Sequence, residues 1–140
     1  MSLSRLFSAA DISASGMSAE RLRMEVVAEN LANANTTRGP NGEAYRRKQV
    51  VFRTLLESEG DGAGGVEVVG VMPEGGELPQ IHLPSHPDAD EFGFVTLPNV
   101  KPTMEMVDMI TAARSYEANL RALRTFKDMA EQALGLLRGA

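Results

Sequence analysis

The stretch ENLANANTTRGPNGEAYRRKQVVF, residues 29–52, joins two kinds of sequence. Its first part continues a helical pattern and carries Asn30, Asn33 and Asn35, whereas its second part contains Gly and Pro and leads into a β-like run. Asparagine favours helix ends and turns because its side chain can hydrogen-bond to nearby backbone. The stretch therefore predicts that a long helix ends here and that a β-rich segment follows.

Glycine and proline divide the chain into three segments. All 7 prolines and ten of the 13 glycines fall between positions 39 and 102. These residues are the strongest local markers of turns and loops. We therefore expect a helical segment at residues 1–35, a β-rich middle module at residues 36–103 and a second helical segment at residues 104–140, which makes the fold class α+β.

Both ends of the chain show the spacing of amphipathic helices. Apolar residues recur at alternating intervals of three and four from Leu3 to Ala34 and again from Met106 to Leu137, with few interruptions. Gly16 lies inside the first pattern and predicts either a close helix contact or a break, because glycine weakens a helix interior. The two patterns predict an antiparallel, coiled-coil-like pair.

The start of the second helix is predicted from its capping residues. Pro102 and Thr103 precede the periodic segment, with Thr103 expected as the N-cap. Glu105 and Asp108 would then complement the positive end of the helix dipole. Gly139 marks the expected end.

The middle module reads as four short strands separated by turns. The β-like runs are KQVVFRTLL, GVEVVGVM, PQIHLP and FGFVTL. The simplest arrangement loops this module out between the paired helices, since the entropic cost of closing a loop grows only slowly with its length.

Some apolar residues do not fit the seam of a helix pair. Leu22 and Val26 lie away from the first stripe, and Val107, Ile110 and Phe126 lie away from the second. Burying such side chains gains ~1.5–3 kcal/mol each. We therefore expect other subunits to cover them.

Composition excludes several classes of protein. The formal net charge of -5 argues against nucleic-acid binding. The absence of cysteine excludes disulfides and thiolate metal sites. No apolar run reaches the ~20 residues of a membrane span, and the N-terminus lacks the pattern of a cleaved secretory signal. We expect no membrane insertion.

Two clusters of polar residues could carry chemistry, and both have simpler interpretations. His82 and His86, close to Asp88, Asp90 and Glu91, could hold a metal, but the loose spacing favours a solvated acidic loop. The basic run YRRKQ, which begins at position 45, could bind phosphate or an acidic surface, or could protect a strand edge. No catalytic motif is visible, so we expect no enzyme activity, cofactor, metal or small-molecule ligand.

Motifs at both ends resemble those of the flagellar rod and hook family. SGM and the core NLANA at positions 30–34 match the N-terminal motif of that family, and RSYEAN at positions 114–119 matches its C-terminal motif. The longer run NANTTRGPNGEAYRRKQVVF, with GFVTLPNV and EMVDMITAARSYEANLRAL, is similar to the branch of this family that builds the proximal rod. The 64–90 region resembles the family least.

The resemblance implies a structural subunit of the bacterial flagellar basal body. Such subunits pass through the flagellar type III export apparatus and polymerise across the periplasm with copies of themselves and with adjacent proximal- and distal-rod subunits. Their terminal helices line a central export channel and transmit torque. The resemblance suggests subunit contacts for seven residues: Asn30, Asn33, Asn35, Arg114, Tyr116, Glu117 and Asn119.

Two alternatives stay open at this point. The asparagines would also be explained by simple helix termination. A cytoplasmic coiled-coil adaptor or export chaperone would share the helices, although it would not need the asparagine motif.

Overall fold

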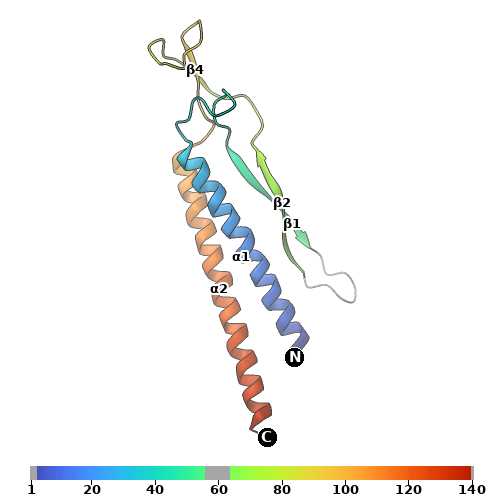
Figure 1. Ribbon diagram of the computed structural model, residues 1–140. Helices are drawn as coiled ribbons and strands as arrows, with labels where there is room; N and C mark the ends of the chain where they lie inside the picture. The colour runs from blue at the N-terminus through green and yellow to red at the C-terminus, as the bar shows by residue number, and fades with distance from the viewer. Residues whose placement is uncertain (1–2, 56–63, 140) are drawn as a thin grey trace. The chain divides into compact units, whose positions relative to one another are not determined.

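The computed structural model describes residues 3–55 and 64–139, with side chains inside the first helix described from Ser8 onwards. Two long helices enclose four strands in the sequence, as the α+β prediction requires (Figure 1). The elements in chain order are α1 (Leu3–Ala32), β1 (Lys48–Leu55), β2 (Gly65–Pro73), β3 (Gln80–His82), β4 (Phe94–Thr96) and α2 (Pro102–Arg138). The predicted stripe positions Leu3 and Leu6 lie outside the described side chains.

The chain forms two compact units, and α1, α2 and the β1–β2 pair each contribute residues to both. The first, here called the terminal unit, comprises Met1–Leu22, Val51–Gly70 and Thr111–Ala140. The second, the central unit, comprises Arg23–Val50 and Val71–Ile110.

Strands β1 and β2 pair in a two-stranded sheet within the predicted insertion between the helices, and hydrogen bonds connect the strands to α1. In the terminal unit, the backbone N–H of Val66 donates to Ser15 Oγ at 3.2 Å. In the central unit, the backbone of Lys48 bonds to the side chain of Asn30. Val26, expected to need another subunit, is buried within the chain.

Strands β3 and β4 form a second sheet in the central unit. They pair antiparallel, with Gln80 opposite Thr96, Ile81 opposite Val95 and His82 opposite Phe94. Side chains alternate between the two faces of a sheet, and Val95 is completely buried. Its cross-strand neighbour Ile81 is 38% exposed, so burial on this face is centred on β4.

Helix α2 begins two residues earlier than predicted, and its buried face differs from the predicted stripe. Pro102 is the first helical residue, a position that suits proline because no partner is needed there for the missing N–H. Thr103 therefore lies inside the first turn and is not the N-cap. Met106, the expected start of the stripe, is 57% exposed, whereas Glu105 and Ala112 are buried. A hydropathy pattern could not reveal this register, because a carboxylate occupies an inward position.

Neither helix, within the described residues, contains a segment long and apolar enough to span a membrane.

Candidate functional site: a buried polar joint at the end of α1

Asn30 is the centre of a buried hydrogen-bonding joint in the central unit. Its side-chain amide donates to the carbonyl of Lys48 at 2.9 Å and to Glu105 Oε2 at 3.0 Å. Its Oδ1 accepts from the Tyr45 hydroxyl and from the Lys48 N–H, both at 2.9 Å. The residue has 0% exposure. An asparagine side chain has two donor hydrogens and one acceptor oxygen with two lone pairs, so all of its bonding capacity is used inside this chain.

Arg47 supplies the positive charge of the joint. Its Nε donates to Glu105 Oε1 at 2.5 Å and its Nη2 donates to Asp108 Oδ2 at 3.2 Å. Nη1 lies 3.6 Å from a carboxylate oxygen of Glu74. Burial lowers the pKa of Arg47, but the hydrogen bond to Glu105 and the surrounding carboxylates outweigh that effect and raise it. Glu105, at 1% exposure, is therefore a buried charge with a hydrogen-bonded partner.

Tyr45 closes the joint from the loop between α1 and β1. Burial, followed by the negative charges of Glu29 and Glu105, raises the pKa of Tyr45 to about 12. The hydroxyl therefore stays protonated at neutral pH and donates to Asn30.

Further bonds fix the backbone that carries these groups. The Arg47 N–H donates to Asn99 Oδ1 at 2.7 Å. Arg46 donates to the carbonyls of Glu74 and Gly76 at 3.2 and 2.6 Å. Three residues of the basic run thus have partners within the chain, since Lys48 also pairs with Glu29 at 2.6 Å. The side chains of these three residues thus bond to other groups of the same chain. The sequence had instead suggested that they bind phosphate or an acidic surface, or protect a strand edge.

Asn33 and Asn35 lie just beyond the last residue of α1. The Asn33 side chain donates to the carbonyl of Glu29 at 2.9 Å and accepts from the Thr36 hydroxyl at 3.1 Å. Its backbone N–H also donates to the Glu29 carbonyl. Asn33 therefore caps the helix and starts the turn, while Asn35 is exposed.

The four C-terminal site residues lie on α2 in the terminal unit. Asn119 packs against Gly16 so closely that a Cβ added there would lie 2.8 Å from its Nδ2. This confirms the close helix contact at Gly16 and excludes a break, since α1 is continuous. Tyr116 is half-buried, Arg114 is exposed, and Glu117 makes an exposed ion pair with Arg121 at 3.7 Å. Contacts of the seven predicted residues with other subunits stay a prediction.

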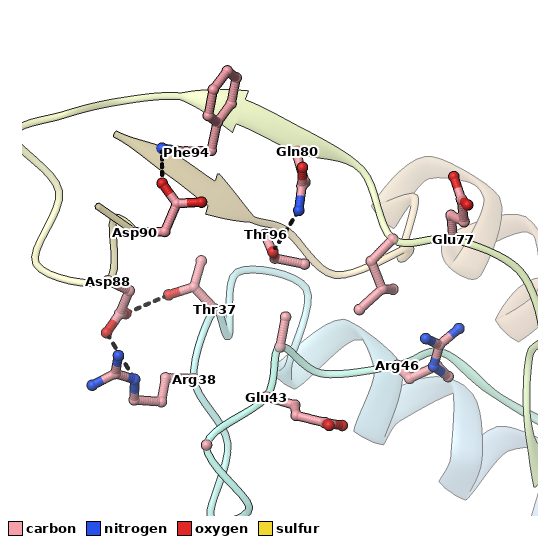
Figure 2. Close-up of a pocket in the computed structure, with 13 residues that line it drawn as sticks. Thr37, Arg38, Glu43, Arg46, Glu77, Gln80, Asp88, Asp90, Phe94 and Thr96 are labelled. Carbon is pink, nitrogen blue, oxygen red and sulfur yellow. Dashed lines mark hydrogen bonds and ion pairs between the residues drawn. The ribbon is translucent and has the colours of Figure 1, made fainter. Parts of the chain in front are cut away.

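The histidine-containing loop lies beside an open depression of about 870 Å³ in the central unit. Figure 2 shows its wall, where Asp88 accepts from the Thr37 hydroxyl at 2.7 Å and pairs with Arg38 at 3.2 Å. His86 Nδ1 accepts the Asp88 N–H, and the His82 ring packs on Phe94. Within the described residues, no group of three or more His, Asp or Glu side chains is arranged to hold a metal.

Two family descriptions match the ends of the chain. Residues 11–40 match "Flagella basal body rod protein", and residues 93–136 match "Flagellar basal body rod FlgEFG protein C-terminal". Among curated proteins, the FlgC rod protein of Aquifex aeolicus is 46% identical, covering 91% of this chain and 93% of that protein. The FlgC proteins of Salmonella typhimurium (41% identity; 90% and 93% covered) and Borreliella burgdorferi (37%; 96% and 99%) are also similar.

The chain belongs to the FlgC family of flagellar basal-body rod proteins.

As a member of the FlgC family, it is a structural subunit of the flagellar basal-body rod and assembles there with other rod components. The two matched segments contain the helix end at Asn30 and the α2 start at Glu105. The joint therefore connects the two matched segments, directly between Asn30 and Glu105 and through Tyr45 and Arg47, which lie outside both.

Sequence reasoning missed Tyr45, Arg47 and Glu105 as parts of one site. One signal was present. Glu105 and Asp108 are three residues apart, which places both carboxylates on the same side of a helix, and the basic run at positions 46–48 offered them a partner.

Proposed function

We propose that this chain is a non-enzymatic subunit of the proximal rod that polymerises through its terminal helices. It contacts copies of itself and neighbouring rod proteins, including adjacent distal-rod subunits, as part of the drive shaft and the export channel. It reaches the basal body through the flagellar type III export apparatus without a cleaved signal peptide, and needs no cofactor, metal or small-molecule ligand.

The observation that carries the proposal is an apolar surface on α2 of the central unit. Met106, Val107 and Ile110 are 57%, 57% and 54% exposed, although they are large and apolar. They share the side of the helix opposite to the buried residues Glu105 and Ala112. A surface of this kind is typical of a protein–protein contact.

The terminal unit offers a second such surface near the end of α2. Leu134, Leu136 and Leu137 are 54%, 77% and 70% exposed. Covering each large side chain would gain ~1.5–3 kcal/mol, so association with neighbouring subunits has a favourable driving force along much of the helix.

The predicted site residues enter this proposal according to their surroundings. Asn33 caps α1 and Asn119 packs on Gly16, both within the chain, and Tyr116 is half-buried on α2. Asn30 acts by holding the α1 end, because its amide atoms are saturated within the chain. Exposed polar groups such as those of Asn35, Arg114 and Glu117 are placed to bond directly to a neighbour.

Introducing a charge into the α2 surface tests the proposal. Val107→Asp combined with Ile110→Asp should leave the isolated chain folded but prevent its recovery in basal bodies and abolish swarming, because an interface would have to bury two carboxylates. Gln49→Asp combined with Thr54→Asp, at exposed polar sites of β1, adds the same two carboxylates away from α2. It is the matched control and should assemble normally. Normal swarming of the double variant would refute assembly through this surface.

A further inference from the structure

Phe92 is a large apolar side chain presented to solvent in the loop between β3 and β4. It is 78% exposed, more than any other large apolar side chain in the described residues. Asp90 holds the loop around it, because its Oδ1 accepts the N–H groups of Phe92 at 2.9 Å and Phe94 at 2.8 Å. Figure 2 shows the second of these bonds. The ring is thus carried by a locally bonded turn.

Gly93 makes this turn difficult to rearrange. It is buried with a φ of +80°, a conformation that favours glycine, and an added Cβ would lie 3.0 Å from both His82 and Pro84. The N–H of Gly93 also donates to the Asp90 carbonyl at 3.0 Å. Because the loop is ordered before any contact is made, docking Phe92 would lose little conformational entropy. Exposed, preorganised aromatic residues are typical anchors of protein interfaces.

The terminal unit contains a hollow that suits such an anchor. A pocket of about 290 Å³ lies between α1 and α2, lined by Ala14, Met17, Ser18, Arg21, Tyr116 and Leu123. A cavity of about 150 Å³ is enough to hold benzene, so a phenyl ring fits in this volume. The thioether of Met17 and the ring of Tyr116 are favourable neighbours for an aromatic group.

Charge supports the same pairing. Glu91 directly precedes Phe92 and is exposed, and Arg21 lines the pocket and is itself exposed. A guanidinium has five N–H donors and can serve more than one partner. Insertion of the ring would bring the carboxylate of the loop to the basic edge of the pocket.

We propose that Phe92 of one copy of this chain inserts into the Met17–Tyr116–Leu123 pocket of a second copy, with Glu91 facing Arg21. The donor loop and the acceptor pocket are different surfaces of the same chain. Such a contact is heterologous, and repetition without ring closure generates a helical filament. The inference rests on the proposed rod assembly and assigns one of its contacts between identical subunits.

A photo-crosslinking amino acid at position 92 tests the contact in assembled rods. Phe92→p-benzoylphenylalanine keeps an aromatic side chain. Irradiation of isolated basal bodies should give a product of twice the chain mass, with the link in residues 14–21 or 116–123. The same replacement at Leu83, exposed in the same loop, should not label that pocket. A link to a different rod protein, or to another part of the chain, would overturn the assignment. Rods that contain the variant but give no such product refute this contact alone, whereas absence of the unaltered chain from basal bodies refutes the proposed function.

Exchanging the two charges tests the proposed contact independently. Glu91→Arg should lower the yield of crosslinked dimer by roughly two- to five-fold, the effect expected of a partly exposed ion pair. Adding Arg21→Glu to the same chain should restore most of the yield. Equal yields in all variants, or no recovery in the double variant, would show that these two charges do not meet.

Discussion

The central and terminal units hold parts of the same two helices by different chemistry. In the central unit, α1 and α2 are connected through directional bonds among Asn30, Arg47 and Glu105. In the terminal unit, the described contact is one of shape, where Gly16 leaves room for the amide of Asn119. Removing one partner of a buried hydrogen bond leaves the other partner unpaired and lowers stability. A close-packed contact is instead disturbed by added volume. The central joint should therefore be the more sensitive to loss of a polar group.

The largest effect is expected at Arg47. Arg47→Leu leaves the Glu105 carboxylate buried without its counter-charge, which should destabilise the fold by ~3–5 kcal/mol. Urea unfolding of the isolated chain, followed by circular dichroism, measures the loss. Arg53→Leu is the matched control, because Arg53 lies on β1 and pairs with Glu67 at the surface, a contact worth ~0–1 kcal/mol. Similar losses in both variants would contradict the importance of the joint.

Asn30→Ala should have the next largest effect. It deprives Tyr45, Glu105 and the Lys48 backbone of bonds, and unpaired buried polar groups cost ~1–3 kcal/mol each. Water entering the vacated space would recover part of this, so a net loss of ~2–3 kcal/mol is expected. Asn35→Ala, at an exposed position of the same motif, should change stability by less than ~0.5 kcal/mol. If both substitutions behave alike in urea, the motif serves only to end the helix.

Ionisation of Tyr45 should weaken the central unit at high pH. Its pKa is about 12 in the folded chain and ~10 in an unfolded one. The protonated hydroxyl therefore stabilises the fold fully below pH ~10, and this contribution is lost as the pH rises through 12. In a Tyr116→Phe chain, phenolate absorbance reports Tyr45 alone and should titrate near 12. Tyr45→Phe should remove this part of the alkaline destabilisation, and an ordinary titration near 10 would refute the buried geometry.

The smallest effect compares two helical glycines. Gly135 has open space around it, so Gly135→Ala should stabilise α2 by ~0.5–1 kcal/mol. Gly16→Ala has the same gain in helix propensity, but its added methyl group must displace the amide of Asn119. This substitution should therefore give little or no net stabilisation. In an Asn119→Ala background the gain at Gly16 should return. Equal stabilisation at both positions in the unaltered background, measured by thermal unfolding, would show that the helix contact is loose.

Local patterns were sufficient to predict the helices and strands. The apolar period from Met17 to Leu31 and the turn-forming residues of the middle are read from neighbouring positions, so both helices and all four β-like runs are found in the structure. For Gly16, the sequence allowed either a close helix contact or a break in the helix. The structure shows the close contact. The exposure predicted for Val107 and Ile110 is also observed.

The joint could not be predicted because its partners are distant in sequence. The sequence predicted Glu105 only as a partner of the helix dipole, whereas a carboxylate is normally exposed and this one is buried. Its burial depends on Arg47, 58 positions earlier. Likewise, the helical pattern around Val26 predicted a need for another subunit, whereas the folded chain itself buries this residue.

The long sequence separations within the joint have a consequence for timing. Asn30 and Glu105 are 75 positions apart, and Arg47 and Asp108 are 61 apart. Suppose that a chain emerges N-terminus first, from a ribosome or from a narrow conduit. Its α1 and basic run are then available long before their acidic partners on α2. The central unit therefore cannot form these bonds until the start of α2 is present. Formation of the joint therefore marks the arrival of the start of α2, because Glu105 and Asp108 are supplied by that segment.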